Sequence, residues 1–349
     1  MEYMDTRVFA IHNGSSIMNA MKKYEGTLLK QYSQDIHTTL IDNITGKHDV
    51  EYCMFKAQLY LHDDLYSCER IYKHGLHGLY FQKNNEPHRE HGFDIQGQDP
   101  RIFIVQDKVY VMFICLSPYP HQYISIGITS FDEWNPVFLQ VEKMTKNYIE
   151  KNWAPFVKDN QLYFVYNYDP LIILHYDFNV EGKCKVVFKQ GNVPLPIDTS
   201  NTYLRGGSNL IHYKEDYYIG GCHSRIFTTC FEHYTHIILL NTRTWELVYV
   251  SPPIKYTCHL KENFNSWWVQ HNPSLKPIDT WDDIIIDRTP HIIQDPVSLY
   301  THRGKHFITI NVRDTITLLY EIVFPDLLKS ITANKPIGYY DMYTNMSLR

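Results

Sequence analysis

The chain has 349 residues, of which 44% are hydrophobic, so it is long enough to bury a large core in one or two domains. Its 33 basic and 38 acidic residues are well mixed and give a net charge of −5, which does not favour nucleic-acid binding. The sequence has no apolar run of membrane-spanning length, and its N-terminus lacks the basic and apolar regions of a secretory signal.

Aromatic residues make up 15% of the chain, including 28 Tyr and 17 Phe, and this enrichment favours strands. The seven cysteines are odd in number and have no C-x-x-C pair, which predicts reduced, buried thiols and a cytoplasmic location. The abundance of Tyr, Asn, Ile and Lys is typical of an AT-rich genome such as that of a large DNA virus, so a viral source is a further expectation.

One stretch sets the pattern for the rest. Asp99-Pro100-Arg101 precedes an apolar segment, a polar turn at Gln106-Asp107-Lys108 and a second apolar segment. Proline fixes its own φ and disfavours a helical conformation for the residue before it. We therefore expect Asp99 and Arg101 to lie in extended backbone where a β-hairpin opens.

The same order of features recurs along the chain. A polar residue and a small residue or proline precede a short apolar strand, a charged turn and a second strand. These hairpins are predicted near 12–29, 98–113, 150–166, 205–219 and 294–310.

Repeated sheets of about four strands, with no Gly/Ser-rich linker between them, favour one all-β domain over residues 1–349, a five-bladed β-propeller. The alternative is a two-sheet sandwich with recurring hairpins. Short helices are expected near 142–149 and 326–329. In a propeller the hairpin openings line one central cavity, so Asp99, Arg205 and Asp314 should lie in one cleft.

The aligned units resemble the five-bladed mannoside phosphorylases of glycoside hydrolase family 130 and the related β-mannosyltransferases. Asp99-Pro100-Arg101 resembles the acidic-Asp-Pro-Arg motif of that family, and Asn13 lies in a segment similar to its Asn-Pro-Ser-Ile opening. The segment 308–314 resembles its closing Ser-Tyr-Gly-x-x-Asp motif. The units at 150–166 and 205–219 are more similar to a divergent branch found beside glycosyltransferases.

This resemblance implies an enzyme that transfers a mannose-like sugar between a phosphate-bearing donor, or phosphate, and an acceptor glycan, by inverting chemistry. Sugar nucleotides and sugar phosphates are therefore the expected partners, and no cofactor is expected. The sequence leaves open a second class, a catalytically silent propeller that binds glycans or proteins, because a fold does not fix a function.

Glycosyl transfer needs a group that exchanges a proton and others that stabilise charge. Asp99 is the candidate general acid/base, since the matching Asp of the resembled family acts on the bond through a sugar hydroxyl. The alternative for Asp99 is a turn cap that pairs with Arg101. Arg101 and Arg205 are candidate phosphate ligands because a guanidinium binds phosphate oxygens bidentately, and an inter-blade salt bridge is the alternative for Arg205.

Other candidates would contact the sugar or phosphate. The resemblance places His223 near the phosphate or sugar and aligns Asp314 with a sugar-binding Asp. Carboxylates accept two hydrogen bonds from sugar hydroxyls. The remaining predicted substrate-binding residues are Asn13, Asp169, Asp295 and Trp153. Surface turn chemistry is the alternative for the carboxylates, and a core position is the alternative for Trp153.

A metal site is not predicted from the 19 histidines. His88-Arg89-Glu90-His91 departs from the H-E-x-x-H pattern of zinc proteases. His233 and His236 lie three residues apart next to a predicted strand, where such spacing directs side chains to opposite faces.

Overall fold

The computed structural model describes eleven stretches of the chain and Phe324. The stretches are 6–13, 52–73, 76–116, 124–142, 150–190, 202–227, 231–251, 257–258, 284–285, 294–312 and 316–322. All regular elements within them are β-strands, numbered β1 to β23. Within these stretches the chain forms no helix of the length and apolarity that a membrane crossing requires. The all-β prediction is therefore confirmed for the described part.

Antiparallel ladders sort most strands into five groups in chain order. The first group is β2 (Tyr52–Leu61), β3 (Asp64–Lys73), β4 (Leu76–Lys83) and β5 (Glu86–His91). The second group is β6 (Gln98–Val105), β7 (Lys108–Leu116), β8 (Ile124–Ser130) and β9 (Val137–Val141). The third group is β10 (Ala154–Lys158), β11 (Gln161–Tyr168), β12 (Leu171–Tyr176) and β13 (Lys183–Lys189).

The last two groups depart from a simple meander. The fourth group is β14 (Thr202–Arg205), β15 (Leu210–Lys214), β16 (Tyr217–Phe227), β17 (Phe231–Asn241) and β18 (Glu246–Val250). The fifth group joins β21 (Gln294–His302), β22 (Lys305–Val312) and β23 (Ile316–Ile322) to β1 (Thr6–Asn13). A separate pair is formed by β19 (Thr257–Cys258) and β20 (Ile284–Ile285). The first and last described strands, β1 and β23, thus lie in one sheet.

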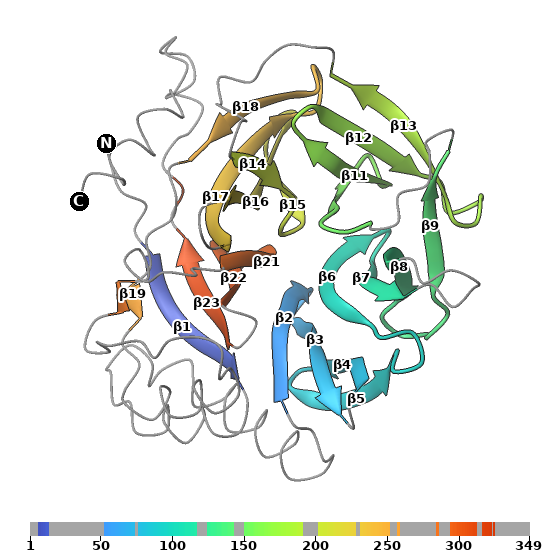
Figure 1. Cartoon of the computed structure of the whole chain (residues 1–349), viewed down its shortest axis with the longest axis vertical. Helices are drawn as coiled ribbons and strands as arrows, with labels where there is room; N and C mark the ends of the chain where they lie inside the picture. The colour runs from blue at the N-terminus through green and yellow to red at the C-terminus, as the bar shows by residue number, and fades with distance from the viewer. Residues whose placement is uncertain are drawn as a thin grey trace.

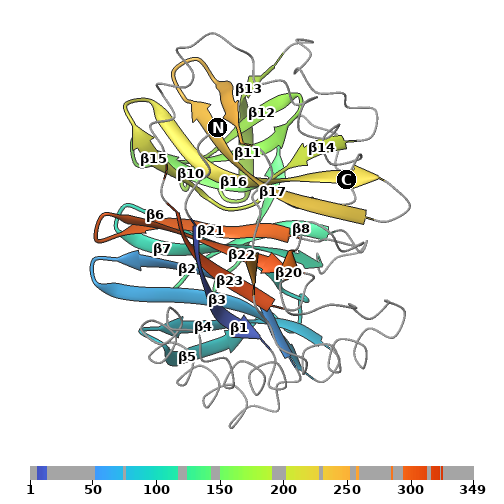
Figure 2. The same cartoon turned by 90° about the vertical axis from the view of Figure 1, so that its left-hand side faces the viewer.

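The groups follow one another around a common centre (Figure 1). The opening strands β2, β6 and β21 contact one another, and β10 contacts both β6 and β15. Short parallel pairings join β10 to β15 and β13 to β9. Along the long axis, strands of the second and fifth groups lie between the first group and the third and fourth groups (Figure 2).

The predicted turns have a local cause. Gln106 and Asp107 have φ of 49° and 58°, and Asp159 and Asn160 have φ of 51° and 58°. Two consecutive residues with positive φ form the type I′ turn, whose twist matches that of the flanking strands. Asn, Asp and Gly tolerate this conformation best, and the β21–β22 turn accordingly ends on Gly304, with φ of 75°.

Apolar side chains fill the spaces between neighbouring groups. Phe103 and Met112 of the second group share one buried cluster with Phe164 and Leu174 of the third. Equivalent clusters join the third group to the fourth and the first group to the second and fifth. Strand β12 is almost wholly buried, and such continuous apolar runs are typical of strands covered on both faces. The cores therefore fix each sheet against the next.

Two features differ from the sequence analysis. The first group, β2 to β5, was not among the predicted hairpins, and Asn13 ends β1 at the edge of the fifth group. The rest of the hairpin predicted near 12–29, the predicted helices and Asp314 lie outside the described residues. Cys68, Cys115, Cys184 and Cys222 are buried free thiols, as expected.

Candidate functional site

The openings of several groups meet through direct contacts. The Nε of Arg101, at the start of the second group, donates a hydrogen bond to the carbonyl oxygen of Gly207 in the fourth. A Cβ added to Gly207 would lie 2.4 Å from Pro296 Cγ in the fifth group, and one added to Gly206 would lie 1.6 Å from the carbonyl oxygen of Asn152 before β10. These glycines allow backbone to approach where a side chain would not fit. The second, third, fourth and fifth groups thus converge at their openings.

Asp99 is held by a residue that the sequence analysis did not select. Its Oδ1 lies 3.0 Å from Nη1 of Arg70 on β3, and the two side chains are 22% and 13% exposed. The extended backbone predicted at Asp99 is wrong, because β6 is irregular between Gln98 and Arg101 and Asp99 has a φ of 49°, a left-handed conformation that aspartate tolerates better than most residues. Arg70 also approaches the ring of His77, whose pKa falls to about 4 through burial and the charge of Arg70. The carboxylate is therefore oriented while it keeps access to solvent.

Arg101 does not pair with the carboxylate of Asp99. It is 3% exposed, and its Nη1 donates hydrogen bonds to the carbonyl oxygens of Asp99 and Pro100. Its guanidinium carbon lies 5.0 Å from the centre of the Phe55 ring of β2, a cation–π contact. Burial lowers the pKa of Arg101, while Asp99 and Asp295 oppose that shift. Arg101 thus connects the openings of the second and fourth groups and places a positive charge near Asp295.

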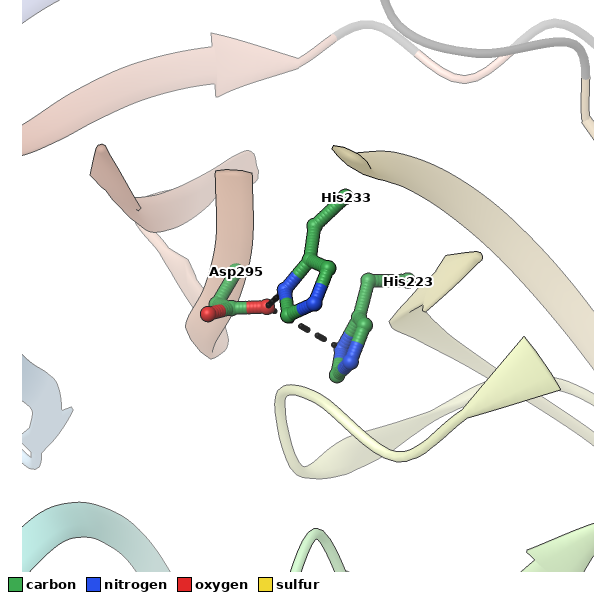
Figure 3. Close-up of side chains that lie close together, drawn as sticks. All are labelled: His223, His233 and Asp295. Atoms are coloured by element: carbon green, nitrogen blue, oxygen red, sulfur yellow. Dashed lines mark hydrogen bonds and ion pairs between the residues drawn. The ribbon is translucent and has the colours of Figure 1, made fainter. Parts of the chain in front are cut away.

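A second polar cluster forms where the fourth and fifth groups meet (Figure 3). Oδ1 of Asp295 lies 3.1 Å from Nδ1 of His233 and 3.2 Å from Nδ1 of His223. Burial alone would raise the pKa of Asp295, but His223, His233 and Arg101 together hold it well below its usual range. Burial lowers the pKa of His223 to about 3, against the charge of Asp295.

The register of the fourth group explains this cluster. Arg205 of β14 is paired directly with His223 of β16, and His223 is paired with Thr235 of β17. His233 precedes Thr235 by two residues, so it lies diagonally from His223 on the same face of the sheet. The two imidazole rings are stacked, with centres 4.8 Å apart. Arg205 is close enough to His223 for its charge to contribute to the low pKa of that residue.

Asp169 lies in the turn between β11 and β12, next to the buried Tyr168. Burial raises the pKa of Asp169. Burial also raises the pKa of Tyr168, and the charge of Arg101 opposes that shift, so this turn is close to the opening of the second group. The Tyr168 hydroxyl has no hydrogen-bond partner among the described residues.

Trp153 occupies a core position, which was the alternative to a sugar platform. It is 1% exposed, packs in the cluster between the second and third groups, and donates its indole N–H to Oε2 of Glu150. Such a ring offers no open face on which a sugar can stack. Asn13 ends β1, and its side chain is not among those described.

Arg70, His77 and His233 are the polar residues of these clusters that the sequence analysis did not assign to a site. His233 was considered only with His236, and the structure confirms that the two point to opposite faces. His236 bonds to Ser224 Oγ and Ser251 O, away from Asp295. His233 could have been selected from the pairing of β16 with β17, because it lies two residues before Thr235, the residue opposite His223. The sequence alone does not give this pairing. Arg70 lies in the strand group that was not predicted, and no motif in the sequence marks it.

Comparison with known proteins supports the resemblance seen in the motifs. Residues 122–228 match the model of a family described as Beta-mannosyltransferases. Beta-mannosyltransferase 3 of Candida albicans is 42% identical over 76 residues, which are 21% of this chain and 13% of that protein. This chain therefore spans far less than two thirds of that curated relative.

Solved structures are similar across most of the chain. A glycosyl hydrolase from Bacteroides ovatus is 9% identical with a TM-score of 0.50, over 80% of this chain and 84% of that one. A structure from the GH130 family of mannoside phosphorylases, which contains hydrolases of β-1,2-mannosidic linkages in Candida mannan, is 9% identical with a TM-score of 0.45, over 80% and 85% of the two chains. The Bacteroides ovatus structure concerns the fold alone. The family match alone confirms the resemblance to the β-mannosyltransferases, and it does so for residues 122–228.

Proposed function

We propose that this chain is a carbohydrate-active enzyme that transfers a mannose-like sugar between a phosphate-bearing donor, or phosphate, and an acceptor glycan. The observation that carries the proposal is the family match over residues 122–228. That segment contains Asp169, Arg205 and His223. Asp99 lies outside it, but Arg101 bonds both to Asp99 and to Gly207 within the segment, so Asp99 lies near the matched residues.

We also propose that the fold is a single closed five-bladed propeller. Five strand groups succeed one another, their opening strands touch, and β1 pairs with β23 of the last group. The pairing of β1 with β23 brings the first and last described strands into one sheet, an arrangement that suits radial repetition. The hairpin openings would then surround the access to one pocket.

Asp99 is the proposed general acid/base. In transfer from a sugar phosphate, the acceptor oxygen forms a bond to the anomeric carbon while the bond from that carbon to the phosphate oxygen breaks. The acceptor proton passes to the Asp99 carboxylate, directly or through a sugar hydroxyl, and the phosphate leaves with its charge. Asp99 suits this role because Arg70 orients it and 22% of its side chain is exposed.

Arg205 is the proposed ligand for the phosphate. It shares a sheet face with His223 and is followed by Gly206 and Gly207, whose backbone accommodates close neighbours. Arg101 is deeply buried and bonded to three carbonyl oxygens, so its contribution is its charge and its support of the openings. A guanidinium held in this way favours the anionic donor without contacting it.

The test is a product assay. The full chain is incubated with a panel of sugar nucleotides and sugar phosphates and a mannan oligosaccharide acceptor, and products are identified by mass spectrometry. Asp99→Asn should lower turnover by about 10²–10⁴-fold, the usual contribution of general acid–base catalysis, with sugar binding retained. Arg205→Lys should instead weaken donor binding because the bidentate fork is lost.

Asp107→Asn is the matched control. Asp107 is exposed in the turn at the far end of the same hairpin and has a φ of 58°, which asparagine also tolerates. This variant should retain full turnover. Wild-type turnover in Asp99→Asn would refute the catalytic role of Asp99. Glycan binding without any product from the wild-type chain would instead identify a binding propeller.

A further inference from the structure

His223, His233 and Asp295 offer three donor atoms in one place (Figure 3). One ligand atom from each residue lies within 4.8 Å of the others, and two of the three separations are 3.1 and 3.2 Å. The three residues come from β16, β17 and β21, so two strand groups build the cluster. Two imidazoles and one carboxylate form a donor set that suits divalent transition metals.

His223 has an unmet requirement for a bonding partner. Its side chain is 2% exposed, and neither ring nitrogen forms a hydrogen bond in the described part of the chain. The Nδ1 atom of His223 lies 3.2 Å from Oδ1 of Asp295, yet the two atoms are not oriented for a hydrogen bond. A buried polar atom without a partner costs stability, so such atoms in native proteins call for an explanation. A ligand that bonds to His223 provides one.

The cluster is also held in place. Pro296, next to Asp295, lies against Gly207 and Gly221, where an added Cβ would be 2.4 Å and 2.7 Å from proline carbons. His223 and His233 are fixed by the β16–β17 register. Their rings lie 21° from parallel, so one ring must rotate about its Cβ–Cγ bond to aim both lone pairs at one point. Rotation about that bond is soft, unlike rotation about Cα–Cβ.

The charge of the surroundings is consistent with this chemistry. A metal ligand must be a neutral imidazole or an ionised carboxylate. The carboxylate of Asp295 brings the negative charge of this cluster, and its Oδ1 faces both imidazole rings. Arg101 and Arg205 oppose a cation, but the guanidinium of Arg101 is already solvated by three carbonyl oxygens.

We propose that His223, His233 and Asp295 bind one divalent transition-metal ion, with Zn²⁺ the simplest match. Ligands about 2.0–2.2 Å from zinc in a tetrahedron lie roughly 3.3 Å apart, close to the two short separations in the cluster. Three protein ligands leave one coordination position open to water or another oxygen ligand. The proposal concerns metal binding alone and does not rest on the proposed glycosyl transfer, although His223 and Asp295 are also predicted substrate-binding residues.

The test measures metal binding directly and needs no assay of enzyme activity. The full chain is stripped with a chelator and titrated with Zn²⁺ by calorimetry, and with Co²⁺ by visible absorption. We expect one ion per chain, with the intense d–d bands of four-coordinate cobalt and no thiolate charge-transfer band. The second feature separates this site from binding by the buried cysteines.

Substitutions then locate the ion. His233→Ala and Asp295→Asn should each weaken binding at least about 100-fold, since even outer-shell partners contribute 10–100-fold. His233 is 17% exposed, so its substitution is the less disruptive of the two. His212→Ala is the matched control because His212 is an exposed histidine of β15 in the same strand group, and it should bind normally. Circular dichroism verifies that each variant folds.

Three results would overturn the proposal. The first is no binding of either metal by the folded wild-type chain. The second is unchanged affinity in His233→Ala. The third is a thiolate band with cobalt, which would assign the ion to cysteine. Each result leaves the glycosyl-transfer proposal untouched, because that proposal is tested by product formation alone.

Discussion

Replacing Gly206 by alanine tests the convergence of the strand groups on which the candidate site depends. The added Cβ would lie 1.6 Å from the carbonyl oxygen of Asn152 and 2.7 Å from its carbonyl carbon. Ordinary contacts begin near 3.4 Å, so the two backbones would have to separate by about 1.8 Å. Overpacking usually costs about 1–3 kcal/mol, and here the obstacle is backbone, so we expect a loss above about 3 kcal/mol.

Urea unfolding followed by tryptophan fluorescence measures this loss. With a slope of about 3 kcal/mol per molar urea, the midpoint should fall by about 1 M or more. Gly78→Ala is the control, since its Cβ would lie 2.7 Å from the Phe93 ring, a side chain that can turn aside. It should cost about 1 kcal/mol at most. If both variants unfold at the same urea concentration, segments 152 and 206 do not touch and the convergence argument fails.

Three further predictions follow from buried groups. Burial lowers the pKa of His236 from 6.5 to about 4, so the unfolded chain takes up the proton first. Stability should therefore fall as pH drops from about 6.5 toward 4, by about 2 kcal/mol at pH 5, and His236→Gln should flatten this slope in urea titrations. Trp153→Phe removes the hydrogen bond to Glu150 and core volume, so the melting temperature should fall while glycan affinity in calorimetry stays unchanged. Asn209→Ala leaves the buried N–H and carbonyl of Leu299 unpaired and should cost about 2–4 kcal/mol in urea unfolding; a loss under 0.5 kcal/mol would contradict this bridge between the fourth and fifth groups.

The parts of the fold that follow local rules could be predicted from the sequence. The turns at 106–107 and 159–160 are set by residues that tolerate positive φ, and they lie where the sequence places them. The strands around them follow from aromatic and β-branched residues. Trp153 also follows a general rule, since an isolated tryptophan is more often part of a core than of a surface.

The first strand group was missed because its polar residues are buried. Lys56, Gln58 and Glu69 are at most 1% exposed, although their types indicate a solvated strand face. They are accommodated by partners distant in sequence, such as the Tyr300 hydroxyl that accepts from Gln58 Nε2. A buried polar residue is tolerated only where such partners exist, and sequence order does not reveal them.

The candidate site has the same long-range character. Asp99 and Asp295 lie outside the family match at 122–228, whereas Arg205 and His223 lie within it. His223 owes its burial and its neighbours to β17 and β21, which follow the matched segment. Residues 122–228 alone would therefore lack both the proposed acid/base and the carboxylate that faces the histidines. The residues proposed for catalysis and for metal binding come from several strand groups, so both activities must be measured on the full chain.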